Sequence, residues 1–335
     1  MTVSSRFVAL RGAILAAALA GLAGLVACAG IGPMSLTPTS SPSPKPTATL
    51  TPTPVPTVTM TPTAISTPTA TATLTPTATL SGTHAAVASA HPTSTPTSLP
   101  TPDGVARLAR VPILIYHHVA PPRPGDDAIR KDLTVSPAQF EAQLRFLKGN
   151  GYESISLDRL NRHLQRGEPL PDRPVVLTFD DGYDDNYPYS LPLLTHYGFE
   201  AAFFVMTQPI EEGREGYLTW PQVELMSRLG MDIEPHSYSH PDLRDKPTDF
   251  LVWEIVGPKE AIEARTGKTC RFFAYPSGGY DERVVQVLKS AGFWGAVTIE
   301  AGDMHSSEGI FALKRVRVRG GYTLEQFVSL LQWDW

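Results

Sequence analysis

Two adjacent carboxylates, Asp180 and Asp181, follow an apolar run at residues 175–179, and two imidazoles, His236 and His240, lie further along the chain. Acidic side chains are rarely buried unless they are paired or bind a metal. One carboxylate with two imidazoles suits a first-row divalent metal such as zinc. The second carboxylate then remains free to act as a base. Together these residue types predict a metal-dependent hydrolase.

The two acids receive different roles in this interpretation. Asp181 completes a three-ligand site with His236 and His240, and a bound cation lowers the pKa of a coordinated water towards ~7. Asp180, next to the ligand, takes the proton from that water. A turn is the alternative for the Asp pair, because Asp-Gly favours turns. A surface loop is the alternative for the His pair. The metal site is preferred because both pairs occur in one chain.

The elements expected around these residues alternate between strands and helices. Repeated alternation predicts a parallel sheet, open or closed into a barrel. The helix at 137–148 has a capping-box pair, Ser136 and Gln139. Strands are expected at 112–116, 154–157, 175–179, 201–205, 231–234, 271–275, 296–299 and 314–318, and helices at 137–148, 157–165, 187–197, 221–229, 250–266, 282–291 and after Thr323.

Polar clusters follow four of these strands. They begin at His117, Asp180, His236 and Ser277. In parallel barrels, reactive residues lie where strands end and loops begin. We therefore expect the four clusters to meet at one catalytic mouth.

Composition excludes several classes of protein. The 335 residues include 28 Lys and Arg and 33 Asp and Glu, for a net charge of -5, without a polybasic block. Nucleic-acid binding therefore gains no support. The two cysteines, Cys28 and Cys270, exclude a disulfide framework and a Cys-rich zinc site. A metal must therefore use His and carboxylate ligands, and we expect Cys270 to be a buried thiol.

The N-terminus is typical of an export signal. Arg6 and Arg11 precede an apolar run at 13–27, which is shorter than the ~20 residues of a spanning helix. Residues 25–28 resemble the lipobox of bacterial lipoproteins, in which the Cys is lipidated. An ordinary secretory signal and an uncleaved anchor are the alternatives. We expect an extracellular or cell-surface protein, attached to the membrane by a lipid on Cys28.

Three regions are predicted from these patterns. Residues 1–28 form the signal peptide. Residues 29–104 form a disordered linker, because their Thr, Pro and Ser content cannot bury enough apolar surface. Residues 105–335 form the globular domain. No protein partner can be inferred.

Three segments together resemble a known family: Thr178-Phe179-Asp180-Asp181-Gly182, His236-Ser237-Tyr238-Ser239-His240 and Phe273-Ala274-Tyr275-Pro276-Ser277-Gly278. They are similar to successive motifs of the polysaccharide deacetylases, also called NodB-homology or carbohydrate esterase family 4 enzymes. The resemblance runs from about residue 111 to 318, with the NodB core at about 173–335.

The resemblance implies a distorted parallel (β/α) barrel. It implies that Asp180 is the catalytic base and that Asp181, His236 and His240 bind Zn²⁺ or a similar ion such as Co²⁺ or Ni²⁺. The implied reaction is hydrolysis of a non-peptide carbon–nitrogen bond. It removes acetyl groups from N-acetylated amino-sugar polymers such as chitin, peptidoglycan or poly-N-acetylglucosamine. An O-acetyl polysaccharide esterase and a non-catalytic carbohydrate-binding protein on the same fold are the alternatives.

The chain departs from the family pattern at several positions. Many members carry an Arg two residues before the Pro of the third motif, where this chain has Ala274. Arg315 is expected to replace it, with a plain salt bridge as the alternative. A late Leu-x-His motif, which commonly supplies the acid, is not found. Residues 112–119 instead resemble the poly-N-acetylglucosamine deacetylase branch, in which a His after the first strand is the acid. The matching residue is His117, with a core-lining role as the alternative.

Further residues are expected to support the site. Tyr275, Pro276 and Gly278 belong to the third motif, and a backbone N–H in this segment is expected to hold the oxyanion. Trp220 is expected to stack on sugar, although ordinary packing is the alternative for Trp220 and Tyr275. Glu234 stands near His236 where small residues are common, and we expect it to alter the pocket beside the metal.

Overall fold

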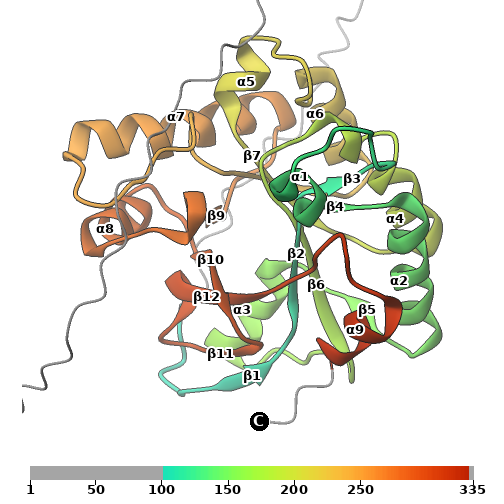
Figure 1. Cartoon of the computed structure of the whole chain (residues 1–335). Helices are drawn as coiled ribbons and strands as arrows, with labels where there is room; N and C mark the ends of the chain where they lie inside the picture. Colours follow the sequence, from blue (N-terminus) through green and yellow to red (C-terminus); the bar gives the residue numbers. More distant parts are fainter. Residues whose placement is uncertain (1–100, 332–335) are drawn as a thin grey trace, which may run out of the picture. The chain divides into compact units, whose positions relative to one another are not determined.

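The computed structural model describes residues 101–331 (Figure 1). The predicted signal peptide at 1–28, with Cys28, and most of the predicted linker at 29–104 lie outside the described residues. Within residues 101–331, none of the helices has the length and apolar character needed to cross a membrane.

Eight strands, paired in parallel, form the central sheet of the described residues. Seven of them follow the order β8-β7-β6-β2-β12-β10-β9, and β5 pairs with β6. Their bounds are β2 (Ile113–Tyr116), β5 (Glu153–Ser154), β6 (Pro174–Phe179), β7 (Ala202–Val205), β8 (Asp232–Pro235), β9 (Phe272–Ala274), β10 (Gly295–Ala301) and β12 (Leu313–Arg317). All eight predicted strands are present. The predicted fold class, a distorted parallel (β/α) barrel, is confirmed.

Helices connect most of these strands (Figure 1). The predicted capping box is present, since the Ser136 hydroxyl accepts from the Gln139 N–H and the Gln139 side chain accepts from the Ser136 N–H. The helix expected at 187–197 begins later, at Ser190. The longer helices are α2 (Pro137–Gly149), α3 (Leu157–Arg166), α4 (Ser190–Tyr197), α6 (Trp220–Arg228), α7 (Thr248–Thr266) and α8 (Glu282–Ser290), and the shorter ones are α1 (Ala128–Leu133), α5 (Thr207–Glu211) and α9 (Leu324–Ser329).

Short elements that the sequence did not predict complete the domain. Strands β1 (Leu108–Arg110) and β11 (Met304–Ser306) form an antiparallel pair. Strands β3 (His118–Val119) and β4 (Thr134–Val135) form a second, parallel pair. Elements of two or three residues are too short to show a hydrophobic period.

Alternate residues of the strands serve two apolar layers, because successive side chains point to opposite faces. Val176 of β6 lies in a cluster with Ile113 of β2 and Leu313 of β12. Leu177 of β6 belongs to the larger cluster, which contains Leu144 of α2. The sheet is thus buried on both faces, as parallel sheets usually are.

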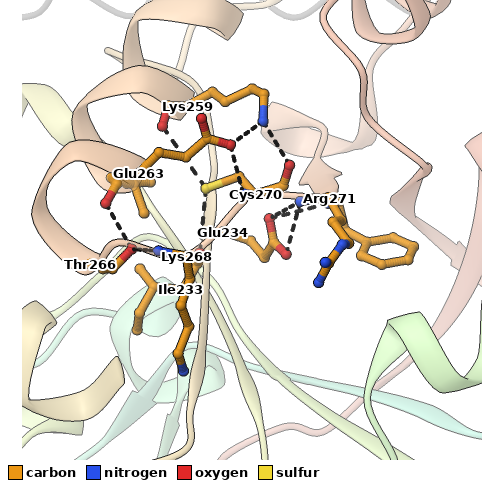
Figure 2. A network of polar contacts seen from close by, with 10 residues as sticks. Ile233, Glu234, Lys259, Glu263, Thr266, Lys268, Cys270 and Arg271 are labelled. Atoms are coloured by element: carbon orange, nitrogen blue, oxygen red, sulfur yellow. Dashed lines mark hydrogen bonds and ion pairs between the residues drawn. The ribbon is translucent and has the colours of Figure 1, made fainter. Parts of the chain in front are cut away.

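The sheet does not close between its first and last strands, β8 and β9, which have no backbone pairing with each other. Figure 2 shows the side chains that bridge this seam. The buried Glu234 carboxylate of β8 accepts hydrogen bonds from the backbone N–H groups of Arg271 (2.9 Å) and Phe272 (3.1 Å). The Cys270 thiol lies 3.6 Å from the Ile233 carbonyl oxygen. Cys270 is buried as predicted. The Glu234 carboxylate therefore bonds to the backbone at the start of β9.

Candidate active site

Asp180 and Asp181 lie directly after β6, at its carboxyl end. Asp180 follows Thr178 in the two-residue period and so belongs to the same face of the strand. Asp181 has a φ of 72°, an uncommon conformation for a residue with a side chain. Gly182 follows with a φ of +75°, and a Cβ there would lie 3.1 Å from the Cβ of Val205. The strained turn directs the two carboxylates to different partners.

Asp181, His236 and His240 form a compact group of potential metal ligands. An Asp181 carboxylate oxygen lies 3.3 Å from Nε2 of His236 and 3.7 Å from Nε2 of His240. One ligand atom of each residue lies within 4.8 Å of the other two. The His236 Nδ1 lies 2.8 Å from the Ala274 carbonyl oxygen, to which it donates, so Nε2 faces the group. This donor set fits a divalent cation.

The electrostatics of two of the three residues agree with that fit. Burial lowers the pKa of His236, but its hydrogen bond to Asp181 and the charges of Asp180 and Asp181 outweigh burial and raise it. Burial raises the pKa of Asp181, but the hydrogen bond and charge of His236 outweigh burial and hold it below its usual range. Burial and the neighbouring charge of His236 lower the pKa of His240. Metal ligands must be an ionised carboxylate and neutral imidazoles. For Asp181 and His240, the surroundings favour those forms.

Asp180 is held by Arg315 of β12. Nη1 and Nη2 of Arg315 donate to the two carboxylate oxygens at 2.8 and 2.6 Å. Nη1 also donates to the Thr178 hydroxyl at 3.1 Å, and Nε donates to the Thr298 carbonyl at 2.7 Å. Burial raises the pKa of Asp180, but the Arg315 guanidinium outweighs burial and keeps it below its usual range. Arg315 therefore binds Asp180 from β12, whereas Ala274, at the position where many family members carry an Arg, has no polar side chain.

His117 directly follows β2 at the same end of the barrel. Burial lowers its pKa to about 4, although the charges of Asp180 and Asp181 oppose that shift. The ring is therefore neutral at neutral pH. A role as acid requires that His117 gain a proton during the reaction.

His118, the neighbour of His117, belongs to a separate network. Its Nδ1 lies 2.7 Å from an Asp185 oxygen, and its Nε2 lies 2.8 Å from Nη1 of Arg130 in α1. Its ring stacks on Tyr183, with centroids 3.5 Å apart. Sequence reasoning gave no role to Asp185, Arg130 or Tyr183, because nothing in their spacing links them to His118.

Tyr275 and its neighbours have mainly packing roles in the structure. The Tyr275 hydroxyl donates to the Phe311 carbonyl at 2.9 Å, and its N–H donates to the Val297 carbonyl at 3.2 Å. The Gly278 N–H donates to the Tyr275 carbonyl at 2.8 Å. Pro276 has no N–H. In the segment from Tyr275 to Gly278, Ser277 is therefore the residue whose backbone N–H is expected to hold an oxyanion.

Gly278 and Trp220 are fixed by local contacts. A Cβ on Gly278 would lie 2.5 Å from Cγ1 of Ile299, so this position requires glycine. Trp220, at the start of α6, packs under Arg265 of α7, with the guanidinium carbon 5.2 Å from the ring. In the described part of the chain, no ring contact or hydrogen bond joins Trp220 to the metal-ligand group.

Comparison with known proteins agrees with this geometry. A family model described as polysaccharide deacetylase matches residues 167–296. A putative polysaccharide deacetylase of Bacillus subtilis, YxkH, is 29% identical over 224 residues, which is 67% of this chain and 77% of that protein. Over residues 167–296 the chain is therefore similar to the polysaccharide deacetylases. The segment matched to the family model contains Asp180, Asp181, His236 and His240, but neither His117 nor Arg315.

Two further proteins are similar to this chain. The structure of the Streptococcus pyogenes deacetylase PplD, solved in complex with acetate, has a TM-score of 0.63 and 28% identity, and the likeness covers 68% of this chain and 100% of that chain. The poly-beta-1,6-N-acetyl-D-glucosamine N-deacetylase of Escherichia coli is 22% identical over 243 residues, which is 60% of this chain. The match spans only 36% of that enzyme's length.

Proposed function

We propose that this protein is a metal-dependent hydrolase that removes N-acetyl groups from N-acetylated amino-sugar polymers of a cell wall or exopolysaccharide. The proposal rests on one observation: the metal-ligand group and the Asp180–Arg315 pair lie at the same end of the barrel. Asp181 groups with two imidazoles, while its neighbour Asp180 is bound by Arg315 through both oxygens. The similarity to the Escherichia coli poly-beta-1,6-N-acetyl-D-glucosamine N-deacetylase supports the class of substrate.

The metal-ligand group supplies one half of the proposed chemistry. A divalent cation held by Asp181, His236 and His240 would act as a Lewis acid on the acetyl carbonyl and would lower the pKa of water. We propose Zn²⁺, with Co²⁺ and Ni²⁺ as alternatives, because neutral imidazoles with one carboxylate suit these ions. The hydrogen bond from Nδ1 of His236 to the Ala274 carbonyl orients the ring for this role.

Asp180 supplies the other half as the base. The Arg315 guanidinium keeps the pKa of its carboxyl low, so the carboxylate is ionised at neutral pH. It takes a proton from the attacking water while the water oxygen bonds to the acetamide carbon. Because Arg315 holds both oxygens, the carboxylate stays oriented through the step.

His117 completes the proton balance. The carbon–nitrogen bond breaks, and the departing sugar amine must gain a proton. We assign this transfer to His117, which is neutral beforehand and therefore receives the proton during the reaction, from Asp180. The products are acetate and a free amino sugar.

Acetate release tests the proposal. The substrates are chitin oligomers, peptidoglycan, poly-N-acetylglucosamine and acetylxylan, each with metal-free and metal-restored protein. We expect metal-dependent release from at least one N-acetylated polymer, and Asp180→Asn should lower the rate about 10²- to 10⁴-fold. Release from acetylxylan alone would indicate an O-acetyl esterase. No release, with polymer binding intact in Asp180→Asn, would indicate a binding protein.

A further inference from the structure

The loop that carries both imidazoles, residues 236–240, has an unusual backbone. Ser237 and His240 both have a φ of 64°, in the left-handed region that residues with side chains seldom adopt. Such conformations persist only where surrounding contacts over-determine them. Within the loop, the His240 N–H donates to the Ser237 hydroxyl at 2.8 Å. One bond inside the loop leaves most of its backbone to be fixed from outside.

Glu254 of α7 provides that external support. One of its carboxylate oxygens accepts the N–H groups of Tyr238 (3.1 Å) and Ser239 (2.9 Å). The other accepts the Ser239 hydroxyl at 2.7 Å. The Glu254 backbone carbonyl also accepts the Tyr238 N–H, at 3.0 Å. Glu254 thus forms hydrogen bonds with Tyr238 and Ser239, which lie between the two His residues in the chain.

Glu254 is buried, and burying a carboxylate costs free energy. Its exposed fraction is 3%. Across residues 101–331, it forms no ion pair with a Lys, Arg or His. A buried carboxylate without a cation is costly unless hydrogen bonds satisfy it. The donors that satisfy Glu254 all belong to the loop that carries His236 and His240.

We propose that Glu254 is a positioning residue for the metal site. It holds the strained loop so that His236 and His240 present their Nε2 atoms to the same point as Asp181. This inference rests on the metal site of the proposed function. Outer residues that orient metal ligands typically change metal affinity about 10- to 100-fold when they are removed.

Metal affinity and thermal stability, measured on the same variants, test this role. Glu254→Met has a similar length and removes both acceptors, and we expect it to weaken Co²⁺ and Zn²⁺ binding about 10- to 100-fold in chelator competition. Glu254→Gln retains an acceptor for the two N–H groups and should bind within about threefold of wild type. Ser239→Ala removes only the hydroxyl contact and should weaken binding roughly 2- to 10-fold. If Glu254→Met does not fold, the affinity of Ser239→Ala still tests the inference.

The matched control is Ile262→Ala, which truncates a buried residue of the same helix. It should lower the melting temperature of the metal-free protein without weakening metal binding. Equal affinity in wild type and folded Glu254→Met, or an equal loss of affinity in Ile262→Ala, would overturn the inference alone. A wild-type protein that binds neither cation would overturn the proposed metal site and this inference with it.

Discussion

Asp180 and Asp181 are neighbours in the chain, yet the fold separates them into two charge environments. Asp180 is held by a guanidinium that binds both of its oxygens, and Asp181 lies against two imidazoles. Each partner keeps its carboxylate ionised by a different contact. The left-handed φ of Asp181 permits this division, because it turns the second side chain away from the line of the first.

The role of Arg315 leads to a prediction about kinetics. Arg315→Lys keeps the positive charge but cannot make two parallel hydrogen bonds to a carboxylate. We expect kcat to fall on the order of 10²-fold with KM little changed, because Asp180 is misoriented while substrate contacts remain. Arg319→Lys, at the exposed pair with Asp132, is the matched control and should leave kcat unchanged. An unchanged kcat in Arg315→Lys would contradict the role given to the guanidinium.

Residue types alone predict groupings that lie in short segments, whereas the contact of Arg315 with Asp180 was expected only from the family pattern. The Asp pair and the His pair each lie in one short segment, so the residue types alone identified them. Arg315 lies 135 positions from Asp180. Their contact arises because β12 and β6 flank β2, an order that no local pattern contains. For the same reason, Glu254 was one acid among several in a predicted helix.

At the scale of elements, long periodic segments were predictable and short pairings were not. The predicted helix at 250–266 corresponds to α7 (Thr248–Thr266). The β1–β11 pair spans nearly 200 positions and has three residues on each side. Tertiary contacts surround the pair, and one of them is made by the buried His305 of β11. The Nε2–H of His305 donates to the Val111 carbonyl at 2.9 Å.

His305 leads to a prediction about stability and pH. Burial lowers its pKa below 6.5, and its Nδ1 is buried without a hydrogen-bond partner. The folded state therefore prefers the neutral ring. Its contribution to the free energy of unfolding is complete above pH 6.5 and is lost as the pH falls below that value. His305→Gln cannot titrate, so between pH 7.5 and pH 5 it should lose less stability than wild type in urea unfolding.

The exposed His196 provides the control for this experiment. His196→Gln should show the same loss of stability with falling pH as wild type. An equal loss in His305→Gln and wild type would mean that His305 does not contribute to acid sensitivity.

At the scale of the whole molecule, the sequence and the structure describe different parts. The structure describes the barrel at residues 101–331, where the predicted fold and the predicted site residues can be compared with the observed ones. The predicted export signal and the interpretation of the Thr/Pro/Ser-rich segment as a linker rest on the sequence alone. We propose that a lipid on Cys28 attaches the protein to the membrane at the cell surface. The segment at 29–104 would then separate the barrel from the bilayer, giving its mouth access to an extracellular polymer.

The full-length Cys28→Ala variant tests this arrangement. In a bacterial host that processes lipoproteins, wild type should incorporate labelled fatty acid and sediment with membranes, because a lipidated Cys is the mature N-terminus. Cys28→Ala should lose the label and leave the membrane fraction. Its rate of acetate release from a soluble substrate should stay within about twofold of wild type, because the anchor at Cys28 and the active site of the barrel lie far apart in the chain and act independently. Cys270→Ala, at the buried thiol, should keep the label. Label retained in Cys28→Ala would refute the lipid anchor, and activity lost with the anchor would refute the separation of the two regions.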